Sequence, residues 1–446
     1  PGEHDLLIER CRELGVHGAF LQCLIQLYDR VLLRVSVDGD TGEAFATHMG
    51  TKQGSELSPL MFGLFIELLH ELIKLQAPGA GPLLSTMRVP DILYADDCAL
   101  IGQSTSDCQQ LLNILDAFCQ LFGMQVNLAP HKTCAVVFRP ATMEVPPDCH
   151  FTFQGQDVPM QDTYIYLGVL LHATQGLARA PPALAASGRR ALQAMLGQLR
   201  RAFLSQFDIR CRMFDILVEP VMSYGCHVWG PAVFHNRLAS RDRPVFMSEA
   251  EKVHLHFLRM MTGTGKSCVD VMLRDMHRAP VMHHWVVLAA RLWTKLAAMP
   301  LDQPSMAREA WLSDIALMRG SETGGRMYTK CWSYRLLHTL QQIGAISAAD
   351  WNASADLTAL QFEEGHVKSC LAACMHARWA SVLLGDPRLA PSAGLEKVVH
   401  ANWVYVVSPD VDCTDRHSAP PHMVLCMPTK HLRVLAQLRL GWAHLQ

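Results

Sequence analysis

Two adjacent carboxylates, Asp96 and Asp97, lie between two short apolar runs at residues 92–95 and 98–101. The runs predict two short buried strands, and the aspartates predict the tight turn that joins them. In a turn, paired oxygen ligands suit Mg²⁺ and leave room for substrate phosphates. Two such ions can stabilise the attacking and leaving oxygens of a phosphoryl transfer. Aspartates are also common in ordinary turns, so a plain structural turn is the alternative.

A second polar pair, Gln53 and Gly54, opens an apolar stretch that predicts a helix to about residue 72. The small Gly54 allows a nucleotide to approach the backbone closely, and Gln53 offers both a donor and an acceptor to a base or sugar. A glycine-led loop before an ordinary buried helix is the alternative interpretation.

Further elements must position these residues. Residues 3–30 predict two helices separated at Gly15 and Gly18, and residues 32–47 predict a hairpin around the turn at 38–42. Ser104 or Thr105 caps a predicted amphipathic helix that ends at Gly123. Residues 135–138 predict a strand that follows Lys132.

Four segments in this order resemble the conserved boxes of reverse transcriptases, of the non-LTR (LINE-type) retrotransposon kind, with group II intron maturases as near relatives. They are residues 50–62, Tyr94-Ala95-Asp96-Asp97, residues 123–127 followed by Lys132-Thr133, and Tyr166-Leu167-Gly168-Val169.

The resemblance implies RNA-directed DNA synthesis, in which a primer 3′-hydroxyl attacks the α-phosphate of a dNTP with Mg²⁺ as the cofactor. An RNA template and a DNA primer are the implied partners, and nicked chromosomal DNA as the primer implies a nuclear site of action. The resemblance assigns metal binding to Asp96 and Asp97, the leaving phosphates to Lys132, the template and dNTP site to Gln53, Gly54, Tyr94 and Ala95, and the primer end to Tyr166, Leu167 and Gly168.

The family's first metal-binding aspartate would lie upstream of Pro1, and Asp5 does not match its position. Because two-metal chemistry needs both carboxylate clusters, we expect a truncated reverse transcriptase whose residues 1–446 are inactive as a polymerase by themselves.

The segment from Arg179 to Arg243 holds ten arginines, no lysine and four acidic residues. Apolar residues at helical spacing predict a bundle, which resembles the thumb that grips a template–primer duplex. Arginine binds phosphate bidentately, and such contacts dominate non-specific duplex affinity. A solvated basic face on a helical bundle is the alternative. The arginines that flank the first apolar stripe are Arg189, Arg190, Arg200 and Arg201.

Composition agrees with a globular protein of two or three domains, since the 446 residues are 50% hydrophobic and 18% charged. The net charge of −2 excludes a chain that is basic overall, but not a local basic surface. The cysteines, scattered in apolar runs (Cys23, Cys98, Cys119, Cys134, Cys226), predict buried reduced thiols. With no secretory signal and no long apolar run, we expect a nuclear or cytoplasmic protein that is neither secreted nor embedded in a membrane.

Other patterns are weaker. Thr262-Gly263-Thr264-Gly265-Lys266-Ser267 lacks the leading glycine and the preceding strand of a phosphate-binding loop, so we interpret it as a turn between helices. Two groups could bind Zn²⁺, although a half-buried thiol face is the preferred interpretation of the first. The groups are His366, Cys370, Cys374 and His376, and then Cys413, His417, His422 and Cys426.

The sequence therefore predicts an α+β protein with a right-hand polymerase architecture: an incomplete palm with an antiparallel sheet at residues 1–172, a helical thumb at 173–300, and a mainly helical extension at 301–446. The predicted function is that of a reverse transcriptase fragment. A degenerate, non-catalytic RNA- or DNA-binding relic of a retroelement is the alternative.

Overall fold

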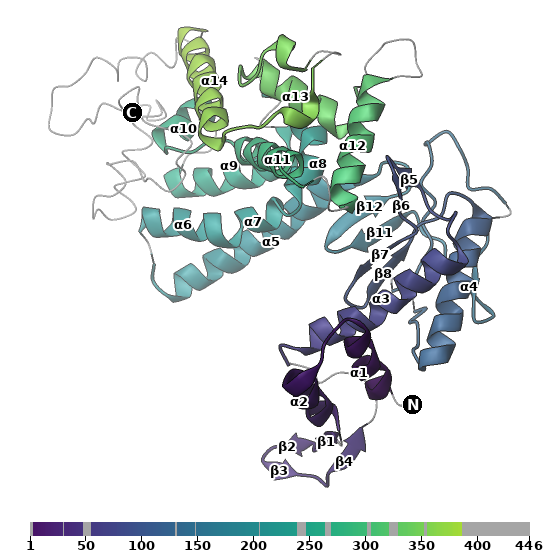
Figure 1. The fold of residues 1–446 in the computed structure, drawn as a ribbon. Coiled ribbons are helices and arrows are strands. Elements are labelled where there is room, and N and C mark those ends of the chain that lie inside the picture. Colours follow the sequence, from purple (N-terminus) through teal and green to yellow (C-terminus); the bar gives the residue numbers. More distant parts are fainter. Residues whose placement is uncertain are drawn as a thin grey trace. The chain divides into compact units, whose positions relative to one another are not determined.

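The computed structural model describes residues 3–29, 31–47, 55–129, 132–147, 149–204, 206–238, 247–263, 269–300, 305–320, 329–351 and 355–385. The chain divides into two compact units (Figure 1). Unit 1 comprises Pro1–Val137 and Met143–Gln161, and unit 2 comprises Phe138–Thr142 and Asp162–Gln446. The predicted boundaries at residues 172 and 300 both fall inside unit 2, and the roles assigned to the three predicted domains stay predictions.

Two helices open unit 1, as the apolar spacing predicted: α1 spans Glu3–Glu13 and α2 spans Gly18–Tyr28. Gly15, between the two helices, and Gly18, the first residue of α2, have φ angles of 85° and 67°. Glycine enters this left-handed region without a steric penalty, so the chain can reverse there.

A hairpin follows, in which β1 (Val31–Leu33) pairs with β4 (Phe45–Thr47) and β2 (Ser36–Val37) pairs with β3 (Asp40–Thr41). The turn residues Asp38 and Gly39 have φ angles of 52° and 93°. Two left-handed residues make the turn that matches the twist of paired strands. The predicted hairpin is confirmed, with a two-residue turn in place of the predicted loop.

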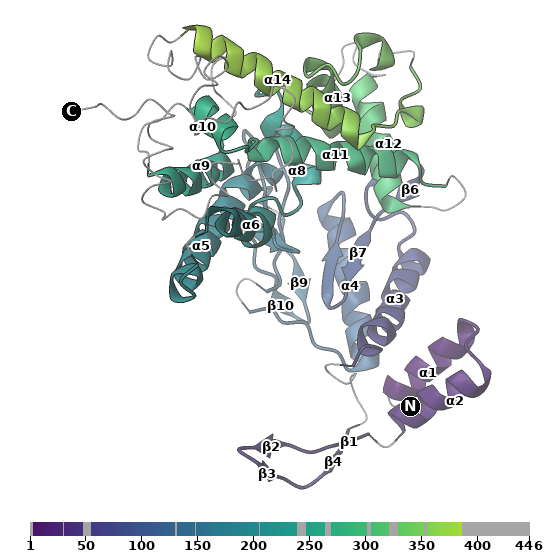
Figure 2. The ribbon, with the colours of Figure 1, turned by 90° about the vertical axis from the view of Figure 1, so that its left-hand side faces the viewer.

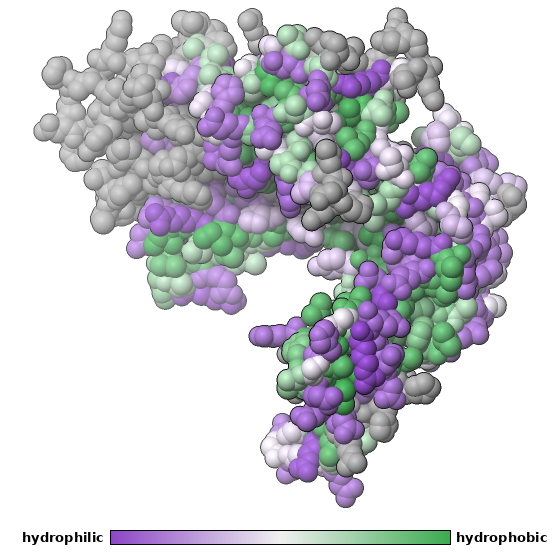
Figure 3. All heavy atoms as spheres, in the orientation of Figure 1, coloured by the Kyte–Doolittle hydropathy of each residue, from purple (hydrophilic) through white to green (hydrophobic). Residues whose placement is uncertain are grey.

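The longest helices of unit 1, α3 (Ser58–Gln76) and α4 (Thr105–Phe122), confirm two further predictions. Ser104 caps α4, because its Oγ accepts a hydrogen bond of 3.1 Å from the Asp107 amide, and Gly123 ends the helix at a φ of 70°. On the face that Figure 3 shows, hydrophobic side chains lie among hydrophilic ones over these helices. The core of unit 1 includes Leu7, Leu24, Leu69, Ile73, Leu111 and Phe118.

The predicted antiparallel palm sheet is present only as separate strand pairs. Among the described residues, strands form six two-stranded antiparallel sheets and no larger one. The predicted strand at 135–138 is wrong, since only an isolated bridge joins Ala135 to Met160 there. The α+β composition is confirmed, and the right-hand architecture stays a prediction. The remaining strands of unit 1 are β5 (Leu83–Leu84), β6 (Met87–Arg88), β7 (Asp91–Tyr94), β8 (Asp97–Leu100), β9 (Thr152–Phe153) and β10 (Gln156–Asp157).

Unit 2 begins with the hairpin of β11 (Thr163–Tyr166) and β12 (Val169–His172) and continues as helices. The first apolar stripe predicted beside the arginines is confirmed in α5 (Ala180–Arg201), since Leu192, Met195 and Leu199 are buried. Phe203, which lies beyond the end of this helix, is 92% exposed. The helices that follow β12 are η1 (Leu177–Arg179), α5 (Ala180–Arg201), α6 (Phe207–Leu217), α7 (Glu219–Met222), α8 (Cys226–Phe234), α9 (Glu249–Thr262), α10 (Val269–Asp275) and α11 (Val281–Ala297).

The C-terminal described segment packs on the hydrophobic core that the preceding helices of unit 2 form. It comprises α12 (Met306–Arg319), α13 (Trp332–Gln342), η3 (Ala348–Trp351), η4 (Leu357–Ala359) and α14 (Glu364–Gly385). Helix α14 lies along α11 (Figures 1 and 2). Trp229 and Trp285 meet edge to face at 4.8 Å between ring centroids, and Trp293 meets Trp311 in the same way at 5.1 Å. No described helix is long and apolar enough to span a bilayer.

The prediction of buried thiols is only partly confirmed. Cys119 and Cys226 are buried, Cys134 is half-buried, and Cys23 and Cys98 are exposed. An apolar neighbourhood in sequence does not bury a residue of a two-stranded sheet whose face is open, which explains Cys98 in β8.

Candidate active site

The two adjacent aspartates lie at the tip of the β7–β8 hairpin, but they do not form its turn together. Tyr94 pairs with Asp97 in the last register position, so the turn consists of Ala95 and Asp96, and Asp97 is the first residue of β8. Ala95 adopts a φ of 52°, which is rare for a residue with a Cβ atom. The strands are also less buried than predicted, since Tyr94 is 63% exposed.

Both carboxylates at this tip are exposed. Mg²⁺ is commonly bound through one or two carboxylates together with substrate phosphates, so an exposed pair fits that part of a magnesium site. Within the part of the chain that the structure describes, no three His, Cys, Asp or Glu side chains gather as a metal site. The hairpin therefore offers a two-carboxylate contribution and not a closed protein cage.

A third aspartate of the same hairpin has a different role, which the sequence did not reveal. Asp91 begins β7 with only 3% of its surface exposed, and its two carboxylate oxygens lie 2.8 and 2.9 Å from Nδ1 of His70 in α3. A buried carboxylate needs such a partner, so this contact fixes β7 against α3. The sequence signal that could have indicated this role is the position of Asp91, an acidic residue directly before the apolar run at 92–95.

The other predicted residues of unit 1 are only partly described. Gln53 and Gly54 lie outside the described residues. Lys132 is exposed in the loop that follows α4, where its amide donates a 3.0 Å hydrogen bond to the Ala129 carbonyl. Its proposed place near the leaving phosphates stays a prediction.

The predicted primer-binding residues form the turn of the β11–β12 hairpin in unit 2. Tyr166 pairs with Val169, and the turn residues Leu167 and Gly168 have φ angles of 46° and 79°. Tyr166 and Leu167 are half-buried and Gly168 is exposed. The ring of Tyr224 lies against Gly168 of this turn, and sequence reasoning placed Tyr224 only in the stretch that resembles a thumb, with no role at the primer end.

The four predicted phosphate-binding arginines all project from α5 and are exposed. Arg189 forms an ion pair with Glu249 of α9, and Lys252 Nζ contacts the other oxygen of that carboxylate at 2.6 Å. Hydrogen bonds from Lys252 and from Arg189 lower the pKa of Glu249. Arg190 donates to Ser187 Oγ at 2.8 Å, and Arg200 Nε donates to the Leu196 carbonyl at 3.2 Å. The positive charge of this surface is therefore partly neutralised at Arg189.

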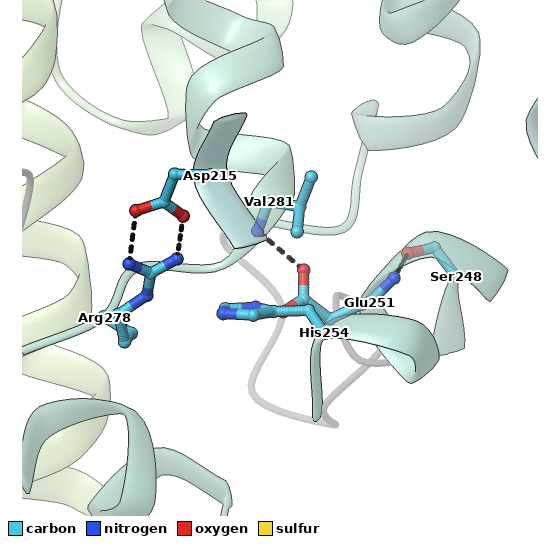
Figure 4. Close-up of polar contacts among 6 residues, drawn as sticks. All are labelled: Asp215, Ser248, Glu251, His254, Arg278 and Val281. Carbon is cyan, nitrogen blue, oxygen red and sulfur yellow. Dashed lines mark hydrogen bonds and ion pairs between the residues drawn. The ribbon is translucent and has the colours of Figure 1, made fainter. Parts of the chain in front are cut away.

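A buried polar core underlies these helices (Figure 4). Arg278 forms a two-pronged contact with Asp215 of α6, in which Nη1 donates to Oδ2 at 2.8 Å and Nη2 contacts Oδ1. Glu251 of α9 accepts a 2.7 Å hydrogen bond from the Val281 amide and lies 2.9 Å from His254 Nδ1. These groups hold α6, α9 and α11 together and are absent from any sequence motif.

The zinc and phosphate-loop patterns give no site among the described residues. Cys370 Sγ lies 3.7 Å from His366 Nε2, and Cys374 is half-buried beside the Ile343 carbonyl, in agreement with a half-buried thiol face. Residues 264–268 and the Cys413–Cys426 group lie outside the described residues. The helix predicted before the loop is confirmed as α9, which ends at Gly263 with a φ of 69°.

The hairpin that carries the two exposed aspartates, β7–β8, lies between α3 and α4 in the chain. Residues 3–171 match the family described as reverse transcriptase (RNA-dependent DNA polymerase).

Among curated relatives, the chain is 23% identical over 176 residues to the Pol polyprotein of a type-1 retrotransposable element R2 from Popillia japonica. It is 24% identical over 184 residues to the R2DM Pol polyprotein of Drosophila melanogaster. A putative transposon-derived protein of Caenorhabditis elegans is 26% identical over 197 residues. The matches cover 38%, 40% and 43% of this chain, and 28%, 17% and 62% of the relatives.

The predicted resemblance to LINE-type reverse transcriptases is thereby confirmed for the N-terminal part of the chain. The matches span less than two thirds of each relative, so the activity of the whole protein is a separate question.

Proposed function

We propose that this chain is part of an RNA-directed DNA polymerase of a non-LTR retroelement. The observation that carries the proposal is the β7–β8 hairpin, which presents Asp96 and Asp97 inside the segment that matches reverse transcriptases. Both carboxylates are exposed, as ligands of a metal that also binds substrate must be.

In this proposal, Asp96 and Asp97 hold Mg²⁺ at the hairpin tip. The ion supplies charge neutralisation at the reacting phosphate and keeps the attacking hydroxyl in line. Tyr94 and Ala95, with Gln53 and Gly54, line the template and dNTP site. Lys132 offsets charge on the pyrophosphate that leaves, a role in which a lysine can also donate a proton.

The substrate duplex is an RNA template paired with a DNA primer. The hairpin turn at Tyr166–Gly168 positions the primer end, and the exposed arginines of α5 contact the phosphates of the duplex. Arg200 and Arg201 are the strongest contributors in this proposal, because Arg189 is paired with Glu249.

Primer extension on an RNA template with Mg²⁺ tests the proposal. Residues 1–446 and the same chain extended upstream along its reading frame are each compared with Asp96→Asn. Asp38→Asn is the matched control, since Asp38 also lies in a two-residue hairpin turn. We expect residues 1–446 to be inactive by themselves. In the form extended upstream, we expect Asp96→Asn to lower extension at least about 100-fold, because a metal site contributes several kcal/mol to such a transfer, and the control to retain it.

A second measurement separates the alternative. If no form extends the primer and yet the chain binds an RNA–DNA hybrid with an affinity that falls steeply with salt, the non-catalytic nucleic-acid-binding interpretation replaces the polymerase. If the chain neither extends the primer nor binds the hybrid, both functions are rejected.

A further inference from the structure

A half-exposed tyrosine ring lies against the turn of the β11–β12 hairpin. A Cβ atom added to Gly168 would lie 3.3 Å from Cε1 of Tyr224 and 3.8 Å from its Cδ1. The ring therefore rests on the one residue of the turn that has no side chain. Tyr224 is nevertheless 51% exposed, so a large part of the ring surface remains open to solvent beside the turn.

The backbone that carries this ring is held firmly from below. The indole of Trp229 donates a 2.8 Å hydrogen bond to the Tyr224 carbonyl, and the indole of Trp285 donates one of 2.8 Å to Ser223 Oγ. Both tryptophans are almost completely buried. Gly225, at a φ of 68°, lets the chain turn directly after Tyr224. A Cβ atom added to Gly225 would lie 3.5 Å from Val169 Cγ2, so the backbone here also lies close to β12.

An aromatic ring that rests on a turn, is carried on a fixed backbone and is half open to solvent can serve as a stacking surface, and bases stack on aromatic faces with little regard to sequence. Its position beside Leu167 and Gly168 places that surface at the turn assigned to the primer end.

We propose that Tyr224 binds the terminal nucleotide of the primer strand by stacking, and that Gly168 is required because any side chain there would displace the ring. The proposal rests on the proposed polymerase function. It adds a nucleotide contact from the α7–α8 turn to a site otherwise formed by β11 and β12.

The test uses the full chain and an RNA template–DNA primer duplex that carries 2-aminopurine at the primer 3′ terminus. A matched duplex carries the probe well inside the double-stranded region. Stacking on tyrosine quenches the probe, so we expect wild-type protein to quench the terminal probe strongly and the internal probe weakly. Tyr224→Phe should keep this difference, and Tyr224→Leu should abolish it and weaken binding about 5- to 100-fold.

Phe203→Leu is the matched control, because it removes another exposed aromatic ring of unit 2. A purely structural role for Tyr224 predicts equal loss at both probe positions. Equal quenching by wild type and Tyr224→Leu would overturn the inference while leaving the polymerase proposal intact, provided that the wild type binds the duplex. Absence of any duplex binding by wild type would overturn both.

A second measurement tests the contact even if Tyr224→Leu fails to fold. Benzoylphenylalanine at position 224 keeps an aromatic ring and should photocrosslink to the terminal primer nucleotide, whereas the same group at position 203 should not. Crosslinks confined to other nucleotides would contradict the proposed contact.

Discussion

The guanidinium of Arg278 and the carboxylate of Asp215 face each other in the interior of unit 2, where their side chains are 2% and 5% exposed (Figure 4). Burial would lower the pKa of Arg278, but the hydrogen bonds and charge of Asp215 raise it above its ordinary value. Arg278 is therefore held in its charged form, and Asp215 is the main group that offsets its buried charge.

Removing one partner of this pair should be costly. Asp215→Asn removes the main counter-charge of the guanidinium, and we expect a loss of about 3–5 kcal/mol in the free energy of unfolding. Denaturant unfolding followed by tryptophan fluorescence measures it. Asp208→Asn, in the first turn of the same helix, is the control and should cost only about 0.3–1 kcal/mol. Equal losses for the two variants would refute a special role for the pair.

Substitutions of two aspartates in the β7–β8 hairpin should have opposite effects, one on stability and the other on activity. Asp91→Ala removes the partner of His70 from a buried site and should destabilise unit 1 by about 1–3 kcal/mol. Asp96→Ala lies at the exposed tip and should change stability by less than about 0.5 kcal/mol, while in the form extended upstream it removes primer extension. Circular dichroism during thermal unfolding and primer extension measure the two effects. The assignment of roles fails if Asp91→Ala is the neutral change.

Gly168 provides a test of backbone geometry. At a φ of 79° and with Tyr224 so near, Gly168→Ala should destabilise by more than about 1 kcal/mol. Gly197→Ala, in the interior of α5 with nothing within 4 Å of the added atom, should instead stabilise by about 0.5–1 kcal/mol. Chemical denaturation of both variants decides the matter, and a neutral or stabilising Gly168→Ala would contradict the observed turn.

Glu249 should lower the affinity of the chain for a nucleic-acid duplex. Its carboxylate pairs with Arg189 and Lys252, so Glu249→Gln frees two cations on the α5–α9 surface. We expect tighter binding of an RNA–DNA hybrid and a salt dependence steeper by about one unit of slope per cation freed. Fluorescence anisotropy across a salt series measures both quantities. Glu9→Gln, an exposed acid that pairs with Arg12 in unit 1, should leave them unchanged.

His235 should make unit 2 sensitive to acid. Burial lowers the pKa of His235 from 6.5 to about 4, and His338 and Arg335 add to the shift. The unfolded chain therefore takes up a proton that the folded chain resists, so stability falls as the pH drops from about 6.5 towards 4. Urea midpoints across that range should decline less in His235→Asn. The exposed His256→Gln is the control, and identical curves for His235→Asn and wild type would exclude this cause.

Local patterns predicted most of the helices and the hairpins at residues 31–47 and 91–100, but not the β11–β12 hairpin. Ser104, Gly123 and the apolar spacing of α4 placed that helix within a residue of its observed bounds. The turn of the β7–β8 hairpin was predicted one residue too late, because Ala95 adopts a left-handed φ that its residue type does not indicate. The segment at 135–138 has the apolar character of a strand, but a strand needs a pairing neighbour, and only Ala135 finds one.

The buried polar contacts could not be predicted at all. His70 and Asp91 lie 21 residues apart in the sequence, and Asp215 and Arg278 lie 63 apart. Nothing local pairs them, because the contact is created by the packing of α3 on β7 in one case and by the placement of Arg278 beside α6 in the other.

The packed indoles of unit 2 have a spectroscopic consequence. All nine tryptophans of the chain lie at position 229 or later, and unit 1 contains none. Tryptophan emission therefore reports on unit 2 alone, and unit 1 is silent at that wavelength. A single tryptophan introduced at Tyr28, a buried aromatic position of α2, would give unit 1 an optical signal of its own and would allow the melting of the two units to be followed separately.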